Sequence, residues 1–282
     1  MKRLLCVGLL STLVACSGKK TTAPDGSNTG ILGGDTVAAD QPAAKHVALL
    51  RATNGKDEYI CTAVLIARNT VLTAAHCGAD LQQGELLFST DLSTDEEDLR
   101  RPVVEVHVQP KFGQTMQRLQ DGQAPRGLKN WGDLAILKFS GRTPRGFRSV
   151  QIGDGTQLSD GQTVLLAGYG QSNTTDPNSA GQLRQVEVRI KKANYSKDEF
   201  TVDQSEGEGA CHGDSGGPAF VTDKGKLYLV GITSRGTANN CQREGIYTRV
   251  SPFVDWINQI LDEKGEEAET SAPSLSEGLL RE

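Results

Sequence analysis

The chain has 282 residues, of which 23% are charged, and a formal net charge of −5. Residues 262–282 carry seven acidic and two basic residues, which accounts for the whole net charge and leaves the rest nearly balanced. A balanced body excludes the strongly basic surface typical of nucleic-acid binding. Residues 31–261 are long enough for one large all-β domain or two packed β-barrels.

The first 15 residues have the features of an export signal. A short basic segment, Met1–Arg3, precedes the apolar segment Leu4–Ala15, which is shorter than the roughly 20 residues of a transmembrane helix. We therefore expect a signal peptide over residues 1–15. Its end, Leu-Val-Ala-Cys, resembles the bacterial lipobox, in which Cys16 is lipidated and becomes the first mature residue. A plain secretory signal cut near Ala15 is the alternative.

Residues 16–30 are expected to form a polar tether, because their composition cannot bury a core. A lipid on Cys16 would associate the protein with the cell envelope of a bacterium. Ser17 resembles the context of lipoproteins sent to the outer membrane of Gram-negative cells, which makes that membrane or the periplasm the expected location.

Short apolar or alternating runs with turn residues between them then recur through the chain. They have strand length and are rich in β-branched residues. The expected strands are Val47–Leu50, Tyr59–Ile66, Thr70–Thr73, Val103–Val108, Leu134–Phe139, Val164–Tyr169, Gln185–Ile190, Lys226–Thr233 and Gly245–Val250. Only Pro252–Leu261 shows the pattern of a helix. Gly113–Asn130 lacks a pattern and is expected to be a surface loop, and residues 262–282 an acidic disordered tail.

Six cysteines fit an exported protein, since disulfides persist in the periplasm or outside the cell. Cys6 leaves with the signal and Cys16 is assigned to the lipid. The remaining four allow three pairings; they are Cys61, Cys77, Cys211 and Cys241. No metal site is expected, because no Cys-x-x-Cys or paired histidine spacing occurs. The acidic run at 91–98 leaves calcium as an alternative.

The hexapeptide at 213–218, Gly-Asp-Ser-Gly-Gly-Pro, is the most informative stretch. A serine hydroxyl is a weak nucleophile that needs a base for its proton and donors for the oxyanion it creates. Glycines on both sides of Ser215 let the backbone turn tightly and direct its N–H groups at one point. The hexapeptide predicts a nucleophile in a preformed anion site; the alternative is a Gly-rich turn with an incidental serine.

The base must precede Ser215, because every histidine does. The four are His46, His76, His107 and His212. The order Ser, acid, His of the α/β-hydrolases is thereby excluded. His76 follows the apolar run at 70–73, and Asp133 directly precedes the apolar run at 134–139. An acid there can be screened from water and can hold the second nitrogen of an imidazole.

Three motifs in this order resemble the chymotrypsin/trypsin family of serine proteases. They are Thr-Ala-Ala-His-Cys at 73–77, Asp-Leu-Ala-Ile-Leu at 133–137 and Gly-Asp-Ser-Gly-Gly-Pro at 213–218. The similarity extends from Ile31 to about Leu261. It implies two packed six-stranded antiparallel β-barrels with a C-terminal helix, and a monomeric endopeptidase that acts on protein or peptide substrates without a cofactor.

The resemblance also implies residue roles. Ser215 would attack the scissile carbonyl, His76 would act as general base and then general acid, and Asp133 would orient His76. The backbone N–H groups of Gly213 and Ser215 would form the oxyanion hole. The implied disulfides are Cys61–Cys77 and Cys211–Cys241.

The family further implies activation by cleavage just before Ile31. The freed α-amino group would turn inward and pair with Asp214, so we expect a zymogen. Gly30 replaces the usual basic residue before the cut, which leaves the activating protease unknown. The same cut would release the catalytic domain from a lipid on Cys16.

The implied specificity pocket consists of Gly209, Ala210, Ser234, Gly236 and Gly245. Gly209 stands where trypsin-like members carry an acid, so a neutral pocket and an apolar or aromatic P1 residue are expected. Glu208 or Glu244 reaching into the pocket would instead favour a basic P1 residue. Arg235 replaces the family's usual aromatic residue; it would contact acidic or polar substrate groups, or point to solvent. A non-catalytic, protease-like binding protein is the other alternative.

Overall fold

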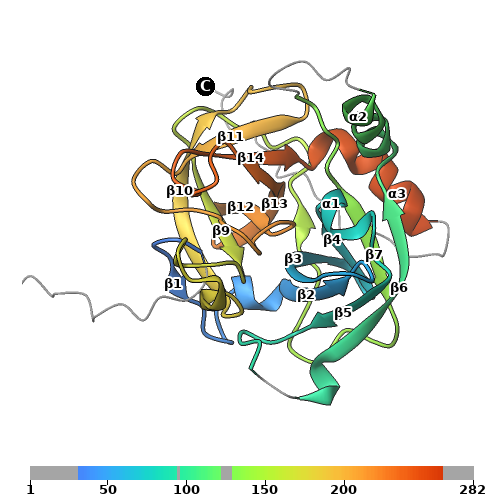
Figure 1. Ribbon diagram of the computed structural model, residues 1–282. Coiled ribbons are helices and arrows are strands. Elements are labelled where there is room, and N and C mark those ends of the chain that lie inside the picture. The colour runs from blue at the N-terminus through green and yellow to red at the C-terminus, as the bar shows by residue number, and fades with distance from the viewer. Residues whose placement is uncertain (1–30, 94–95, 122–128, 263–282) are drawn as a thin grey trace, which may run out of the picture.

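A computed structural model describes residues 31–93, 96–121 and 129–262. The expected signal peptide and tether, and all of the expected tail except Asp262, lie outside the described residues. The described chain forms two β-barrels that lie side by side (Figure 1). Among these residues no helix is both long and apolar enough to cross a membrane.

The first barrel is a closed antiparallel ring in the order β2-β3-β4-β7-β6-β5. Its strands are β2 (Val47–Thr53), β3 (Glu58–Ala67), β4 (Thr70–Thr73), β5 (Gln83–Leu87), β6 (Arg100–Val108) and β7 (Ala135–Phe139). Nearly every side chain of β2, β4 and β7 is buried, because these side chains face either the interior of the ring or the second barrel.

The second barrel is closed by the pairing of β9 with both β10 and β12. Its ring strands are β9 (Thr163–Gly168), β10 (Arg184–Lys192), β11 (Glu199–Asp203), β12 (Pro218–Asp223), β13 (Lys226–Gly236) and β14 (Glu244–Arg249). Two short strands, β1 (Asp35–Thr36) and β8 (Gln151–Ile152), add to its edges. The expected architecture of two six-stranded antiparallel barrels is confirmed.

Within the described part of the chain, three α-helices accompany the barrels: α1 (Ala75–Gly78), α2 (Pro110–Gln120) and α3 (Val254–Asp262). The C-terminal helix was expected, but the prediction of a loop from Gly113 onward was wrong, because α2 continues to Gln120. Gln109 caps α2 by accepting a hydrogen bond from the Lys111 N–H, and Pro110 suits the first helical position. Gly113 and scattered apolar residues conceal this helix in the sequence.

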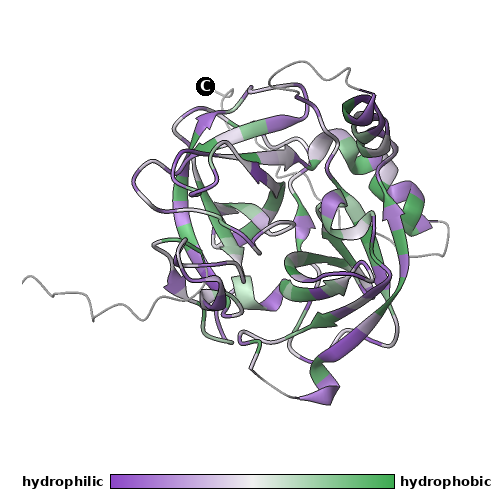
Figure 2. Ribbon diagram, viewed as in Figure 1, coloured by the Kyte–Doolittle hydropathy of each residue, from purple (hydrophilic) through white to green (hydrophobic). Residues whose placement is uncertain are grey.

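Hydrophobic residues occur along the strands of both barrels (Figure 2), and apolar side chains from both barrels form the buried core. The largest fully buried side chains include Tyr169, Tyr247, Phe88, Phe139, Phe200 and Phe220. Tyr169, just after β9, reaches toward the first barrel, where its hydroxyl donates a hydrogen bond to the Ser89 carbonyl at 2.6 Å. Burial of this apolar surface is the main favourable contribution to folding.

Thr62 of β3 joins the barrels at a fully buried position. Its hydroxyl donates a hydrogen bond to the Gly213 carbonyl at 3.1 Å and accepts one from the Tyr169 N–H at 3.2 Å. Both partners belong to loops of the second barrel. One hydroxyl therefore satisfies two buried backbone groups and fixes the loop that carries Gly213 and Ser215.

Thr62→Val should lower the free energy of unfolding by about 2 kcal/mol, because it leaves a buried N–H and a buried C=O unpaired without changing the side-chain shape. Denaturant unfolding of both proteins measures the difference. Thr201→Val is the matched control. The Thr201 hydroxyl is fully buried and has no partner among the described residues, so its removal should cost nothing. Equal losses in the two variants would contradict this role for Thr62.

Candidate active site

His76 and Asp133 meet at one edge of the first barrel because of strand pairing. In the register of β4 with β7, Thr73 lies opposite Ala135. The chain that leaves β4 into α1 therefore passes the chain that enters β7. His76 lies on α1 and Asp133 lies two residues before β7.

The Asp133 carboxylate is buried, with 1% of the residue exposed, and three donors satisfy it. The His76 Nδ1–H donates to Oδ2 at 2.9 Å, and the backbone N–H of His76 donates to Oδ1 at 3.0 Å. The Ser234 hydroxyl, from β13 of the second barrel, donates to Oδ2 at 2.6 Å. A carboxylate only accepts hydrogen bonds, so these contacts fix the His76 tautomer with its proton on Nδ1.

The two ionisable groups shift each other's pKa. Burial opposes the charge on Asp133, but His76 and the donated hydrogen bonds outweigh it and hold the Asp133 pKa below its usual range. Burial likewise opposes the charge on His76, yet the neighbouring Asp133 carboxylate leaves the His76 pKa raised above 6.5. The imidazole is thus poised to accept a proton from a neighbour near neutral pH.

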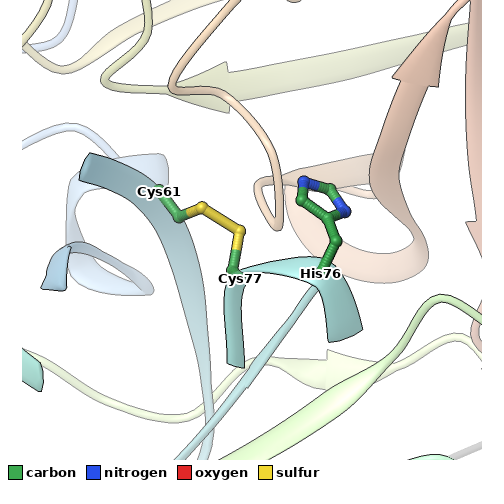
Figure 3. A group of neighbouring side chains, drawn as sticks. All are labelled: Cys61, His76 and Cys77. Atoms are coloured by element: carbon green, nitrogen blue, oxygen red, sulfur yellow. A yellow bond between two sulfur atoms is a disulfide. The ribbon is translucent and has the colours of Figure 1, made fainter. Parts of the chain in front are cut away.

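A disulfide anchors the short helix that carries His76 to a neighbouring strand (Figure 3). Cys77 of α1 is bonded to Cys61 of β3. The Cys77 Sγ lies 3.8 Å from the Ser215 carbonyl oxygen, which also accepts the Thr62 N–H at 2.8 Å. The structure thereby brings the loop of Ser215 against the element that carries His76.

The Ser215 loop depends on two glycines with positive φ. Gly213 has φ of 98°, and Gly216 has φ of 82°. A Cβ on Gly216 would overlap the Thr73 hydroxyl and the Thr62 carbonyl. The predicted disulfide between Cys211 and Cys241 forms and closes this loop on its other side. These conformations explain why glycine flanks the serine.

Asp214, next to Ser215, is fully buried but turned away from the cavity. Its carboxylate accepts the N–H groups of Gly170 at 2.7 Å and Cys211 at 2.8 Å. Burial raises the pKa of Asp214 to about 7, because these two bonds offset only part of the desolvation. A positively charged partner would complete this site.

A cavity of about 240 Å³ opens beside Ser215. Four of the five expected pocket residues line it: Ala210, Ser234, Gly236 and Gly245. The fifth, Gly209, is not among the lining residues. A Cβ at Gly209 would lie 2.5 Å from the side chain of Gln204, which does line the cavity.

Gln204 is the pocket residue that the sequence did not disclose. Its Nε2 donates to the carbonyls of Ala210 at 2.9 Å and Cys241 at 2.7 Å, which fixes the amide orientation. Its Oε1 has no partner among the described residues. Glu208 is exposed and Glu244 pairs with Lys191 at 3.3 Å; neither lines the cavity. In the described chain, the cavity lining therefore contains the uncharged Gln204 amide and no carboxylate.

The two His and Cys groupings in the described residues offer no metal site. His76 lies near Cys61 and Cys77, and His212 lies near Cys211 and Cys241. All four cysteines are bound in disulfides, so they have no thiolate to donate to a metal. Calcium at the acidic run 91–98 was the alternative. In that run, Asp91 Oδ1 accepts hydrogen bonds from the Ser93 hydroxyl and the Ser93 N–H, both at 2.8 Å.

The Trypsin family model matches residues 31–257. The chain belongs to the trypsin family. It is 27% identical to "Chymotrypsin-like elastase family member 1" of Felis catus, over 90% of this chain and 97% of the relative. It is also 27% identical to "CLIP domain-containing serine protease B4" of Anopheles gambiae, over 87% of this chain and 77% of the relative. The match to "Vitamin K-dependent protein C" of Oryctolagus cuniculus, at 26% identity, covers 78% of this chain and half of that protein.

In this family member, Asp133→Asn should lower the pKa of His76 below 6.5. The substitution removes the negative charge that raises this pKa, while the burial that lowers it remains. NMR titration of the four histidines in the wild type and in Asp133→Asn measures the change. A His76 pKa that stays above 6.5 in Asp133→Asn would show that another group sets it.

Proposed function

We propose that this trypsin-family chain is a serine endopeptidase with Ser215 as nucleophile, His76 as base and Asp133 as the residue that orients the base. The observation that carries the proposal is the buried Asp133 carboxylate, bonded to the His76 imidazole beside the cavity that Ser215 lines. Burial of a charged carboxylate generally lowers the stability of a fold, even when donors surround it. A role in catalysis explains its presence, because a carboxylate at this position stabilises the imidazolium that forms when His76 accepts a proton.

The proposed peptide hydrolysis assigns the following steps to these residues. As the Ser215 Oγ bonds to the scissile carbonyl carbon, its proton passes to His76 Nε2, and the N–H groups of Gly213 and Ser215 bind the carbonyl oxygen as it becomes negative. The C–N bond then breaks while His76 gives the proton to the leaving amine, which leaves an acyl-enzyme. Water attacks the ester with His76 again as base, and the acid departs as Ser215 regains its proton.

The proposed P1 residue is apolar or aromatic. The uncharged Gln204 amide lines the cavity, and neither Glu208 nor Glu244 does. A lysine or arginine side chain would enter without a counter-ion, and burial of an unpaired charge is strongly unfavourable. This arrangement speaks against the basic-P1 alternative, although discrimination among apolar residues should be graded.

Activation is proposed to follow a cut between Gly30 and Ile31. Ile31 is buried against the second barrel and has φ of 43°, an uncommon value for a β-branched residue. The next residue is already docked, since Leu32 and Gly209 exchange backbone hydrogen bonds at 2.9 and 3.0 Å. The partner proposed for a freed Ile31 ammonium is Asp214, which has no cationic partner among the described residues and whose pKa is raised.

The proposed location is the cell envelope of a bacterium. Two disulfides fit an exported protein. A signal peptide over residues 1–15 and a lipid on Cys16 would associate the precursor with a membrane, and the cut before Ile31 would release a monomeric protease. A non-catalytic binding protein is the alternative function, which kinetics with variants of Ser215 and His76 distinguish.

Ser215→Ala and His76→Ala should each lower kcat/KM for peptide hydrolysis by at least about a thousandfold, and the double variant should lose no more than either one, because the two groups act in one step.

The P1 preference would be measured with peptides that differ only at P1. The wild type should cleave after phenylalanine or leucine at least about tenfold faster than after lysine. Additive losses would contradict the shared step, and a preference for lysine would contradict the neutral pocket.

A protein that begins at Ile31 should be at least about a hundredfold more active than the full chain, because a freed Ile31 ammonium would pair with the buried Asp214 carboxylate. Removal of Asp214 by Asp214→Asn should abolish this gain. N-terminal sequencing of active protein identifies the cut. Full activity in protein that begins at Cys16 would contradict activation before Ile31.

A further inference from the structure

A second buried ion pair lies beside the candidate active site. Arg235 of β13 directs its guanidinium inward, where Nη1 donates to Glu199 Oε1 at 2.9 Å. The Glu199 side chain is fully buried, and 19% of the Arg235 side chain is exposed. The guanidinium also lies over the Trp131 ring, 4.4 Å from its centre. Arg235 is therefore paired and mostly buried rather than directed to solvent, and it also lines the cavity beside Ser215.

Glu199 also organises the chain segment that leads to Asp133. Its Oε2 accepts the Asn130 N–H at 3.0 Å, and its Oε1 accepts the Trp131 N–H at 3.2 Å. Asn130 has φ of 61°, so this segment turns sharply just before Asp133. The Glu199 carboxylate of the second barrel thus holds in place the segment of the first barrel that leads to Asp133.

The ion pair connects to Asp133 through a single hydroxyl. Arg235 Nη1 donates to the Ser234 Oγ at 3.2 Å, and that hydroxyl donates to Asp133 Oδ2 at 2.6 Å. With its lone pair engaged by Arg235, the Ser234 hydroxyl is oriented to donate its proton to the carboxylate. A hydroxyl that serves as acceptor on one side becomes the better donor on the other.

Several ionisable groups surround His76. Asp133 precedes β7, and Arg235 lies on β13. Tyr59 of β3 donates to the Cys77 carbonyl at 2.9 Å, and Asp80 follows α1 and helps burial to raise the Tyr59 pKa. Asp133 raises the His76 pKa, whereas the positive charge of Arg235 lowers it.

We propose that Glu199 and Arg235 are positioning residues for the proposed protease reaction: Arg235 holds Ser234 against Asp133, and Glu199 neutralises the buried guanidinium and fixes the segment before Asp133. This inference rests on the proposed function. It assigns a purpose to the replacement of an aromatic residue at 235. The charges predict opposite effects when either partner is removed, which damage to the structure alone would not produce.

Arg235→Met should raise the pKa of His76 by about half a unit or more, because it removes a positive charge near a partly desolvated imidazole. Glu199→Gln should lower this pKa, because it leaves the Arg235 charge uncompensated. Arg235→Lys keeps the charge and should leave the His76 pKa near the wild-type value. It should still lower kcat, because an ammonium lacks the planar, multiple donors with which the guanidinium bonds to both Glu199 and Ser234. NMR titration of His76 in the full-length protein measures the pKa in each of the three variants, and the acid limb of the kcat/KM profile should shift in the same direction as the His76 pKa.

Lys111→Met is the matched control. Lys111 pairs with the neighbouring buried Asp198 at 2.6 Å, and in the described chain neither of these two side chains bonds to Ser234 or Asp133. Its removal should leave the His76 pKa unchanged. Unchanged or parallel shifts in Arg235→Met and Glu199→Gln would overturn the inference, and if Glu199→Gln does not fold, the contrast of Arg235→Met with Arg235→Lys decides. Opposite shifts in a protein without peptidase activity would support the inference and contradict the proposed function.

Discussion

The structure depends on one buried negative charge, the carboxylate of Asp133. A carboxylate removed from water destabilises a fold unless donors surround it. Here they come from both barrels: His76 provides two from the first, and Ser234 provides one from the second. Separation of the barrels would expose this charge to water and remove the Ser234 donor. The contact that aligns the proposed base therefore also holds the two halves together, and the Thr62 hydroxyl repeats this link nearby.

Departures from the family pattern occur here with compensating partners. Arg235 replaces an aromatic residue, and the fully buried Glu199 balances its charge while Trp131 supplies an aromatic ring against it. Gly209 stands where trypsin-like members carry an acid, and the Gln204 side chain occupies the space that a Cβ there would need. Each of these two positions is thus understood only with its partner. The bonds to Asp133 are those that the proposed chemistry requires.

The sequence disclosed most strands and the motifs around His76, Asp133 and Ser215 because those signals are local, and the two-barrel architecture followed from the resemblance that these motifs carry. Alternation marks strands such as Gln185–Ile190, and small residues around His76 and Ser215 mark tight turns. The missed features depend on contacts between distant segments. β11 was missed because its first residue, Glu199, looks like a surface acid, and only the distant Arg235 makes its burial favourable. Gln204 was missed for the same reason, since its partners are the carbonyls of Ala210 and Cys241.

The most direct test of the central claim is the site at which an activated-serine reagent bonds to the protein. A fluorophosphonate would be reacted with protein beginning at Ile31, and the modified residue identified by mass spectrometry. We predict one adduct, on Ser215, with a rate that increases as His76 loses its proton and that collapses in His76→Ala. No adduct, an adduct on another residue, or an undiminished rate in His76→Ala would contradict the account.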